Sequence, residues 1–310
     1  MSFLTKYGSL WGAIPMTGGR IFWVAAATGY QIDGRSGYPA SDNHDGLSPE
    51  RAKRTVAGAV DLAAGNDVVV LLPGTHTVQT ASVAMDTAGV TLMGLPVFGS
   101  PNMNRTILTT DITADEIINV TAANCQIAYL RIRPITAAAA IDVSANGDNL
   151  WVHHCSFDLE TPAANTATIA IASIGASADR TLVEHCFFES DGAQGAGIAL
   201  SGSTNFTVRH NRFAVDTGTW AAAITMVAQE PGGWIEHNGF FTIKNGVITD
   251  AINGAELVTT NSVAIAYNIF SPGCIAPVID TFGTTDAYLA ENYLMGAGGG
   301  AGGSIIATIT

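Results

Sequence analysis

Hydrophobic and polar positions recur in one order along most of the chain: apolar, variable, His or Tyr, Asn or Cys, variable, Phe. The order holds in residues 152–157, 183–188, 208–213, 235–240 and 265–270, with weaker copies at 90–95, 127–132 and 289–294. If the Asn or Cys position is the marker, the markers are residues 93, 130, 155, 186, 211, 238, 268 and 292, which lie 24 to 37 residues apart. A repeat of this period indicates a solenoid or another array of stacked units.

A second apolar stretch lies between most markers. These stretches are residues 139–143, 168–171, 197–200, 222–227 and 277–279. They are rich in alanine and β-branched residues, are bounded by Gly, Asn, Asp and Ser, and lack the periodicity of amphipathic helices, so they predict strands. The apolar core of the repeat is constant, whereas the number of residues between successive markers varies. This predicts coils joined by loops of different length. We therefore expect an all-β fold, a right-handed parallel β-helix whose coils stack about 4.8 Å apart.

Two columns of the repeat have a structural meaning in such a coil. The phenylalanines should stack inside it, and the asparagines should form a ladder at a tight turn, where their amides bond neighbouring coils. Cys155 and Cys186 take the ladder position on adjacent turns, where buried thiols are favoured and a disulfide is geometrically possible. The phenylalanines are Phe157, Phe188, Phe213, Phe240 and Phe270, and the asparagines are Asn211, Asn238, Asn268 and Asn292.

The chain before the repeat has a different pattern. Ser48 can cap a helix that begins at Pro49 and continues to Ala64. We expect this helix to cover the N-terminal mouth of the coil, which would otherwise expose a strand edge. The chain then divides into an anchoring and oligomerisation segment (1–44), the β-helix with its capping helix (45–295), and a glycine-rich linker with a C-terminal strand (296–310).

Composition narrows the class of protein. The chain has 13 basic and 26 acidic residues, a formal net charge of −13, and 47% apolar residues. This balance excludes a disordered chain and disfavours nucleic acid as a partner. We expect no membrane span and no secretory signal, because apolar runs are short and the N-terminus lacks a basic region before an apolar stretch. Four cysteines are too few for a disulfide framework, which favours assembly in a reducing cytoplasm.

Three segments resemble pectate-lyase-like parallel β-helix proteins: residues 45–52, the corner Pro73-Gly74-Thr75-His76, and residues 90–96. With the asparagine coils, the likeness extends over about residues 45 to 310. Residues 6–15 and 19–24 resemble the start of β-helix proteins of tailed-phage virions, which include tail spikes and head-decoration proteins. Homotrimers are common among such phage proteins, so the resemblance implies a homotrimer.

The first functional hypothesis is a structural virion protein without catalytic residues or cofactors, a decoration or cement protein bound to the major capsid protein on the virion surface. Large apolar residues outside the repeat imply an interface with the capsid protein or with another subunit. An uncharged C-terminal strand adds a second edge to this interface. These residues are Phe3, Leu4, Tyr7, Leu10, Trp11, Ile14, Phe22, Trp23, Ile305, Ile306 and Ile309. The alternative is a tail spike that binds or cleaves a host surface glycan.

Candidate chemistry on the coils is sparse. The outward position two residues before each marker places Glu184, Arg209 and Glu236 on consecutive turns. They could form an acid–base site, but a surface charge ladder explains them as well. Asp158 and Glu189 should be neighbours that could bind a cation or act as a carboxylate pair, and solvated loop carboxylates explain them as well. Arg131 and Arg133 could act as a base, without an evident acidic partner.

Two further patterns argue against a metal site. The column His154, His185, His210 and His237 follows the repeat itself, at a spacing too wide for one zinc ion, and indicates turn-packing histidines that donate to neighbouring carbonyls. Asp42, Asn43 and Asp45 lack the ligand density of a strong calcium site, which leaves only weak binding. The candidate exposed aromatics form no run; they are Phe187, Trp220, Phe241 and Tyr293.

Overall fold

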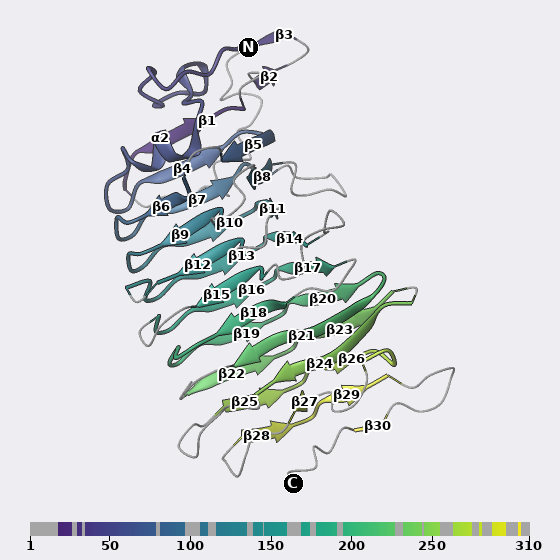
Figure 1. The fold of residues 1–310 in the computed structure, drawn as a ribbon. Coiled ribbons are helices and arrows are strands. Elements are labelled where there is room, and N and C mark those ends of the chain that lie inside the picture. Colours follow the sequence, from purple (N-terminus) through teal and green to yellow (C-terminus); the bar gives the residue numbers. More distant parts are fainter. Residues whose placement is uncertain are drawn as a thin grey trace.

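The computed structural model is a right-handed parallel β-helix with almost no helical structure. It describes residues 18–26, 30–32, 35–78, 81–96, 106–110, 116–134, 139–144, 146–159, 169–173, 178–190, 195–226, 232–243, 245–254, 263–274, 279–280, 287–295 and 303–304. Successive coils stack along one axis from β1 to β28 (Figure 1). The fold expected from the repeat is thereby confirmed.

Three long sheets form the walls of the coil, and each pairs strands from consecutive turns. Sheet 1 precedes the marker turn and contains β1 (Ile21–Val24), β4 (Val68–Leu71), β7 (Thr91–Gly94), β10 (Gln126–Ala128), β13 (Trp151–His153), β16 (Leu182–Glu184), β19 (Thr207–Arg209), β22 (Gly233–Glu236), β25 (Val263–Ala266) and β28 (Ala287–Ala290).

Sheet 2 follows the marker turn. It contains β5 (Gly74–Val78), β8 (Thr106–Thr110), β11 (Arg131–Arg133), β14 (Ser156–Leu159), β17 (Phe187–Ser190), β20 (Arg212–Val215), β23 (Gly239–Thr242), β26 (Ile269–Phe270) and β29 (Tyr293–Leu294), and ends with β30 (Gly303–Ser304), which pairs antiparallel with β29.

Sheet 3 closes the coil with β6 (Val83–Met85), β9 (Ile118–Val120), β12 (Ile141–Val143), β15 (Ile171–Ser173), β18 (Ala196–Leu200), β21 (Thr219–Met226), β24 (Val247–Asn253) and β27 (Ile279–Asp280). A separate hairpin joins β2 (Tyr30–Ile32) to β3 (Arg35–Tyr38). The second apolar stretches of the repeat overlap five of the sheet 3 strands, β12, β15, β18, β21 and β27.

Alternation along each short strand decides which side chains enter the core. On sheet 2 the middle position points inward, and Phe157, Phe188, Phe213, Phe240 and Phe270 are all fully buried there. Their rings stack with centroids 4.7–4.9 Å apart and planes within 8° of parallel. The ring spacing matches the separation of hydrogen-bonded strands, so the backbone ladder sets it.

The marker turn carries a buried asparagine ladder. The amide nitrogen of Asn211 donates to the carbonyl of Val183 and to Oδ1 of Asn238, and Asn238 repeats the pattern with Val208 and Asn268. Asn268 bonds Asn292 in the same way. Each ladder oxygen also accepts a hydrogen bond from a backbone N–H of the preceding coil. For Asn211 this donor is the N–H of Cys186, so the ladder extends to the cysteine turn. All four cysteines of the chain are buried and free.

The register corrects the earliest marker. Met93 is paired with Ala128, two residues before the marker of its coil, so the turn position of that coil is Leu95 rather than Met93. Leu95 donates its backbone N–H to the carbonyl of Leu71 in the preceding coil. The sequence alone does not fix the alignment of the weak copy at 90–95, because it contains neither the asparagine nor the phenylalanine of the stronger copies.

The solenoid begins before the boundary at residue 45. Strand β1 pairs in parallel with β4, and its Phe22 and Trp23 are 2% and 6% exposed. The expectation that these two residues form an intermolecular interface is therefore wrong, because the first coil of the chain itself buries them. The burial of Phe22 and Trp23 results from strand pairing between residues about 47 positions apart, and the sequence repeat does not predict this pairing.

The capping helix is shorter than expected and begins later. Pro49–Arg51 forms a 3₁₀ turn in which Ser48 makes no side-chain cap, and α2 extends only from Val56 to Val60, capped by Thr55. The chain between them is extended because Lys53 exchanges backbone hydrogen bonds with Trp23 and Ala25 beside β1. Helix α2 still contacts β1, β4, β5 and β6, with Val56, Ala59 and Val60 in the core.

Several expected interface residues lie outside the described residues. They are Phe3, Leu4, Tyr7, Leu10, Trp11 and Ile14 near the N-terminus, and Ile305, Ile306 and Ile309 near the C-terminus. Within the described part of the chain, no helix has both the length and the apolar character needed to span a bilayer.

Candidate functional site

Three exposed aromatic side chains share one column of sheet 1. The strand register aligns Gln126, Trp151, Leu182, Thr207, Trp234, Ala264 and Tyr288 across consecutive coils. Trp151 is 38% exposed, Trp234 50% and Tyr288 67%. At about 4.8 Å per strand, Trp151 and Trp234 are separated by roughly 14 Å and Trp234 and Tyr288 by roughly 10 Å. The aromatic column therefore runs parallel to the axis of the solenoid.

A charged column lies beside the aromatic one, two residues further along each strand. It reads Ala128, His153, Glu184, Arg209, Glu236, Ala266 and Ala290. The alternation of the repeat predicts these residues on one outward column, and the register agrees. Short strands explain the arrangement: the middle residue of each strand points into the core, so its two neighbours must point outward.

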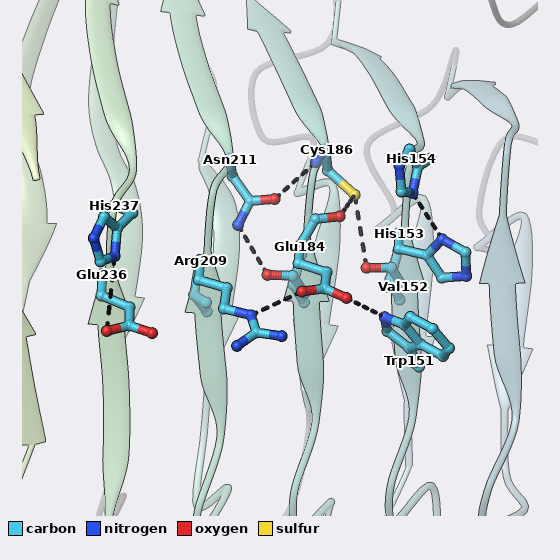
Figure 2. Close-up of polar contacts among 12 residues, drawn as sticks. Trp151, Val152, His153, His154, Glu184, Cys186, Arg209, Asn211, Glu236 and His237 are labelled. Atoms are coloured by element: carbon cyan, nitrogen blue, oxygen red, sulfur yellow. Dashed lines mark hydrogen bonds and ion pairs between the residues drawn. The ribbon is translucent and has the colours of Figure 1, made fainter.

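Glu184 joins the two columns, as Figure 2 shows. Its Oε1 accepts a hydrogen bond from the Trp151 indole at 3.0 Å, and its Oε2 accepts one from Arg209 Nε at 2.8 Å. The Glu184 side chain is 9% exposed and that of Arg209 39%. Glu184 thus holds the Trp151 ring on one side and the Arg209 guanidinium on the other.

The electrostatics of Glu184 favour the charged form. Burial alone raises the pKa of its carboxyl, but the hydrogen bond and charge of Arg209, the Trp151 indole and the nearby His185 outweigh it, so the pKa lies below the ordinary value. A carboxylate held ionised by two donors is a poor general acid. Of the two readings of Glu184, Arg209 and Glu236, the geometry favours the charge ladder over an acid–base site.

A second polar chain starts from Gln126 in the aromatic column. Thr91 Oγ1 donates to Gln126 Oε1 at 3.3 Å, which turns the amide nitrogen toward His153 Nε2 at 2.5 Å. His153 Nδ1 and His154 Nδ1 are hydrogen-bonded to each other at 2.9 Å. The His153 ring lies against Trp151, with centroids 4.1 Å apart. Burial, with the positive charge that His154 and His185 can carry, lowers the pKa of His153 to about 4.

The histidine column is a stack of rings at the marker turn. Tyr129, His154, His185, His210, His237 and Tyr267 follow one another with centroids 5.0–5.1 Å apart. All six adopt a left-handed backbone conformation with φ between 53° and 57°. The expectation of side-chain donation to carbonyls needs correction, because for His185, His210 and His237 it is the backbone N–H that donates to the next coil, while the rings stack.

The carboxylate pair expected on sheet 2 is present but serves another purpose. Asp158 and Glu189 are in register on β14 and β17. Asp158 is only 1% exposed and is paired with Arg131 at 2.5 Å and Arg133 at 3.7 Å. Asp158 is therefore not a solvated loop residue, and it is the acidic partner that the two arginines lack in the sequence pattern.

The acidic residues near the N-terminal end are also engaged. Asp42 Oδ1 accepts hydrogen bonds from the backbone N–H groups of Arg54 and Thr55, and Asp45 pairs with Arg51. The described residues contain no group of three or more His, Cys, Asp or Glu side chains that could hold a metal ion.

The sequence pattern does not predict the aromatic column. Of the exposed aromatics expected from the sequence, Phe187, Phe241 and Tyr293 lie on sheet 2, and Trp220 is fully buried in the core. The signal is present in the sequence, because Trp151, Trp234 and Tyr288 each stand four residues before a marker. By alternation that position also faces outward, but its aromatic side chains become one column only when the strand register aligns the coils.

Comparisons with known proteins identify the fold. No protein-family model and no curated protein sequence matches the chain. Among solved structures, the pectin methylesterase from Aspergillus niger is similar over 91% of this chain and 86% of its own, with a TM-score of 0.53 and 13% identity. The pectin methylesterase from Erwinia chrysanthemi covers 86% of this chain and 80% of its own, with a TM-score of 0.51 and 10% identity. At such identities the similarity establishes a shared parallel β-helix fold.

Proposed function

We propose that the outer face of sheet 1 binds a linear polysaccharide that lies parallel to the solenoid axis. The observation that carries the proposal is the single column of Trp151, Trp234 and Tyr288, beside the polar column that contains Glu184 and Arg209. Aromatic rings offer flat apolar surfaces for the C–H faces of sugars, and a few placed polar groups give orientation.

The spacing of the coil suits a repeating ligand. One strand step of about 4.8 Å is close to the advance of one sugar ring in an extended chain. The two intervals in the aromatic column, three strands and two strands, then correspond to whole numbers of sugar units. Several weak contacts along one polymer add up to useful avidity without a deep pocket.

The shared fold supports a polysaccharide ligand over a capsid-decoration role. The pectin methylesterases named above act on a polysaccharide, and a related pectin methylesterase structure with a TM-score of 0.53 contains a bound hexasaccharide. This favours the glycan-binding alternative of the sequence reading. The decoration role, the homotrimer, the contact with a major capsid protein and the virion-surface location remain predictions of the resemblance.

The test is affinity electrophoresis against a panel of soluble neutral and acidic polysaccharides that includes pectin. Trp234→Ala should weaken binding about fivefold for the loss of one stacked ring worth about 1 kcal/mol. Tyr293→Ala is the matched control, because Tyr293 is similarly exposed (47%) but lies on sheet 2. The proposal is wrong if the wild type binds none of the panel, or if both variants lose affinity equally.

The same incubations distinguish binding from cleavage. Reducing ends and unsaturated products report on turnover. The sequence predicts no turnover, but the solved structures of similar fold are enzymes, so it should be measured. Because both Glu184 oxygens are occupied by donors, Glu184→Gln should weaken the support of Trp151 without abolishing a reaction. Turnover that vanishes in this variant would show that Glu184 is catalytic.

A further inference from the structure

Sheet 2 carries an arginine held between two aromatic rings. Arg212 on β20 places its guanidinium carbon 5.3 Å from the centre of the Phe187 ring and 5.0 Å from that of Phe241. Phe187 lies on β17 and Phe241 on β23, the strands on either side of β20 (Figure 1). Both distances are within the range of cation–π attraction. We call Phe187, Arg212 and Phe241 the arginine clamp.

A glycine makes room for the clamp. Gly239 is the register partner of Arg212 on β23, and a Cβ atom there would lie 2.3 Å from the Phe241 ring. The Phe241 side chain therefore occupies the space that a side chain at position 239 would take, and this brings its ring over Arg212. The clamp depends on a specific small residue, which distinguishes it from a chance contact of surface side chains.

The polar edge of Arg212 is unused within the described chain. Seven other arginines whose side chains the structure describes each have a polar partner: Arg20, Arg51, Arg54, Arg131, Arg133, Arg180 and Arg209. Among the described residues, the Arg212 guanidinium contacts the two rings and has no polar partner, and the residue is exposed to solvent. Glu189, on the neighbouring strand, is in register with Ala214 rather than with Arg212.

An unpaired guanidinium is unexpected in a chain with 26 acidic and only 13 basic residues. Two rings limit the rotation of the exposed guanidinium, so little conformational freedom is lost when a ligand binds. The planar fork of donors suits an oxyanion, which it can bind with two parallel hydrogen bonds.

We propose that the arginine clamp is a binding site for an oxyanion group, a carboxylate or a sulfate, on an external ligand whose apolar surface rests against Phe187 and Phe241. The site is on sheet 2 and is separate from the aromatic column of sheet 1. Because the net charge of −13 repels anions at long range, the attraction must act at short range.

The test uses three soluble polymers: dextran sulfate as the sulfate probe, hyaluronate as the carboxylate probe, and unmodified dextran. The full chain should bind at least one charged probe in calorimetric titration, and the stronger of the two identifies the oxyanion. Arg212→Gln should reduce that affinity about tenfold or more. Arg212→Lys should recover only part of it, because lysine keeps the charge but lacks the planar fork.

Controls separate the clamp from general charge and from the other face. Arg51→Gln removes one exposed positive charge at the distant N-terminal end and should leave binding unchanged. Trp234→Ala should also leave it unchanged, whatever its effect on the sheet 1 ligand. Gly239→Ala displaces Phe241 and should weaken binding although Arg212 is retained; Phe241→Leu repeats this test if Gly239→Ala does not fold. Equal losses in Arg212→Gln and Arg51→Gln, or no binding to either charged probe, would refute the proposal.

Discussion

The inner phenylalanine column and the outer ring column come from the same repeat, three residues apart, yet they differ in order and in chemistry. Inner rings lie 4.7–4.9 Å apart with planes within 8° of parallel, whereas outer rings lie 5.0–5.1 Å apart with planes 6–33° from parallel. The backbone ladder imposes nearly the same spacing on both. Close packing on every side imposes the stricter order of the inner column.

The two columns also differ in what they contribute. The inner rings are fully buried and stabilise the coil by removing apolar area from water. The outer rings are partly exposed, and burial with neighbouring charges lowers the pKa of His154 and of His210, so the contribution of the column depends on pH. A substitution in each column and a change of pH should therefore distinguish the stability that comes from buried packing from the stability that comes from ring stacking.

The largest effect is expected from Phe213→Ala. Its ring is fully buried between Phe188 and Phe240, so the variant leaves a core cavity and should lower the free energy of unfolding by about 3–5 kcal/mol. His210→Ala, at the matching outer position of the same coil, should cost less than about 1 kcal/mol. Urea denaturation followed by circular dichroism measures both. Similar losses for the two variants would mean that ring stacking, rather than burial, stabilises the columns.

Acid should lower the free energy of unfolding through histidines whose pKa is lowered. Burial lowers the pKa of His153 to about 4, and burial with neighbouring histidines also lowers the pKa of His154 and of His210. The unfolded chain then binds protons near pH 6.5 that the folded chain takes up only at lower pH. Stability is complete above about pH 6.5 and should fall as the pH drops toward about 4, with His153 contributing about 2–3 kcal/mol.

The histidine effect can be isolated from that of the carboxylates. The pKa values of Asp42, Asp67 and Glu184 lie below their ordinary values, because backbone or arginine donors outweigh burial, so these groups destabilise the fold only at more acidic pH. The free energy of unfolding, measured by urea denaturation, should fall between about pH 7 and about pH 4.5. The His153→Gln variant should show a smaller fall. An unchanged fall in this variant would exclude His153 as its source.

A smaller effect is expected at the turn between the two columns. Asn238→Ala removes donors to Val208 and Asn268 and an acceptor for the Asn211 N–H, and should cost about 1–3 kcal/mol. Cys186→Ala, at the same turn position two coils earlier, should cost less, because a thiol makes only weak hydrogen bonds. Thermal unfolding compares them, and a larger loss at Cys186 would show that the ladder adds little beyond filling space.

The repeat was sufficient to predict the solenoid, its inward phenylalanines and its outward columns, because alternation and left-handed turns are local properties of each coil. Even the pairing of Glu184 with Arg209 follows from counting positions relative to the marker. The marker error at Met93 shows where this reasoning fails: a coil without the asparagine or the phenylalanine offers no internal reference.

Other features depend on contacts between distant segments. The pairing of strand β1 with β4 places Phe22 and Trp23 in the first coil. Lys53 pairs beside β1, which interrupts the expected helix. Neither pairing has a signal in the repeat, because backbone hydrogen bonds between non-repeated segments carry no side-chain pattern.

The sequence by itself determined the columns, and the tertiary structure decided the role of each residue within them. Asp158 is buried by its arginines, Trp220 lies in the core, and Trp151 and Trp234 lie in the open. Exposure of a side chain depends on the loops and neighbouring coils that surround it. Those loops differ in length from turn to turn, so identical positions of the repeat meet different surroundings only after the coils have stacked.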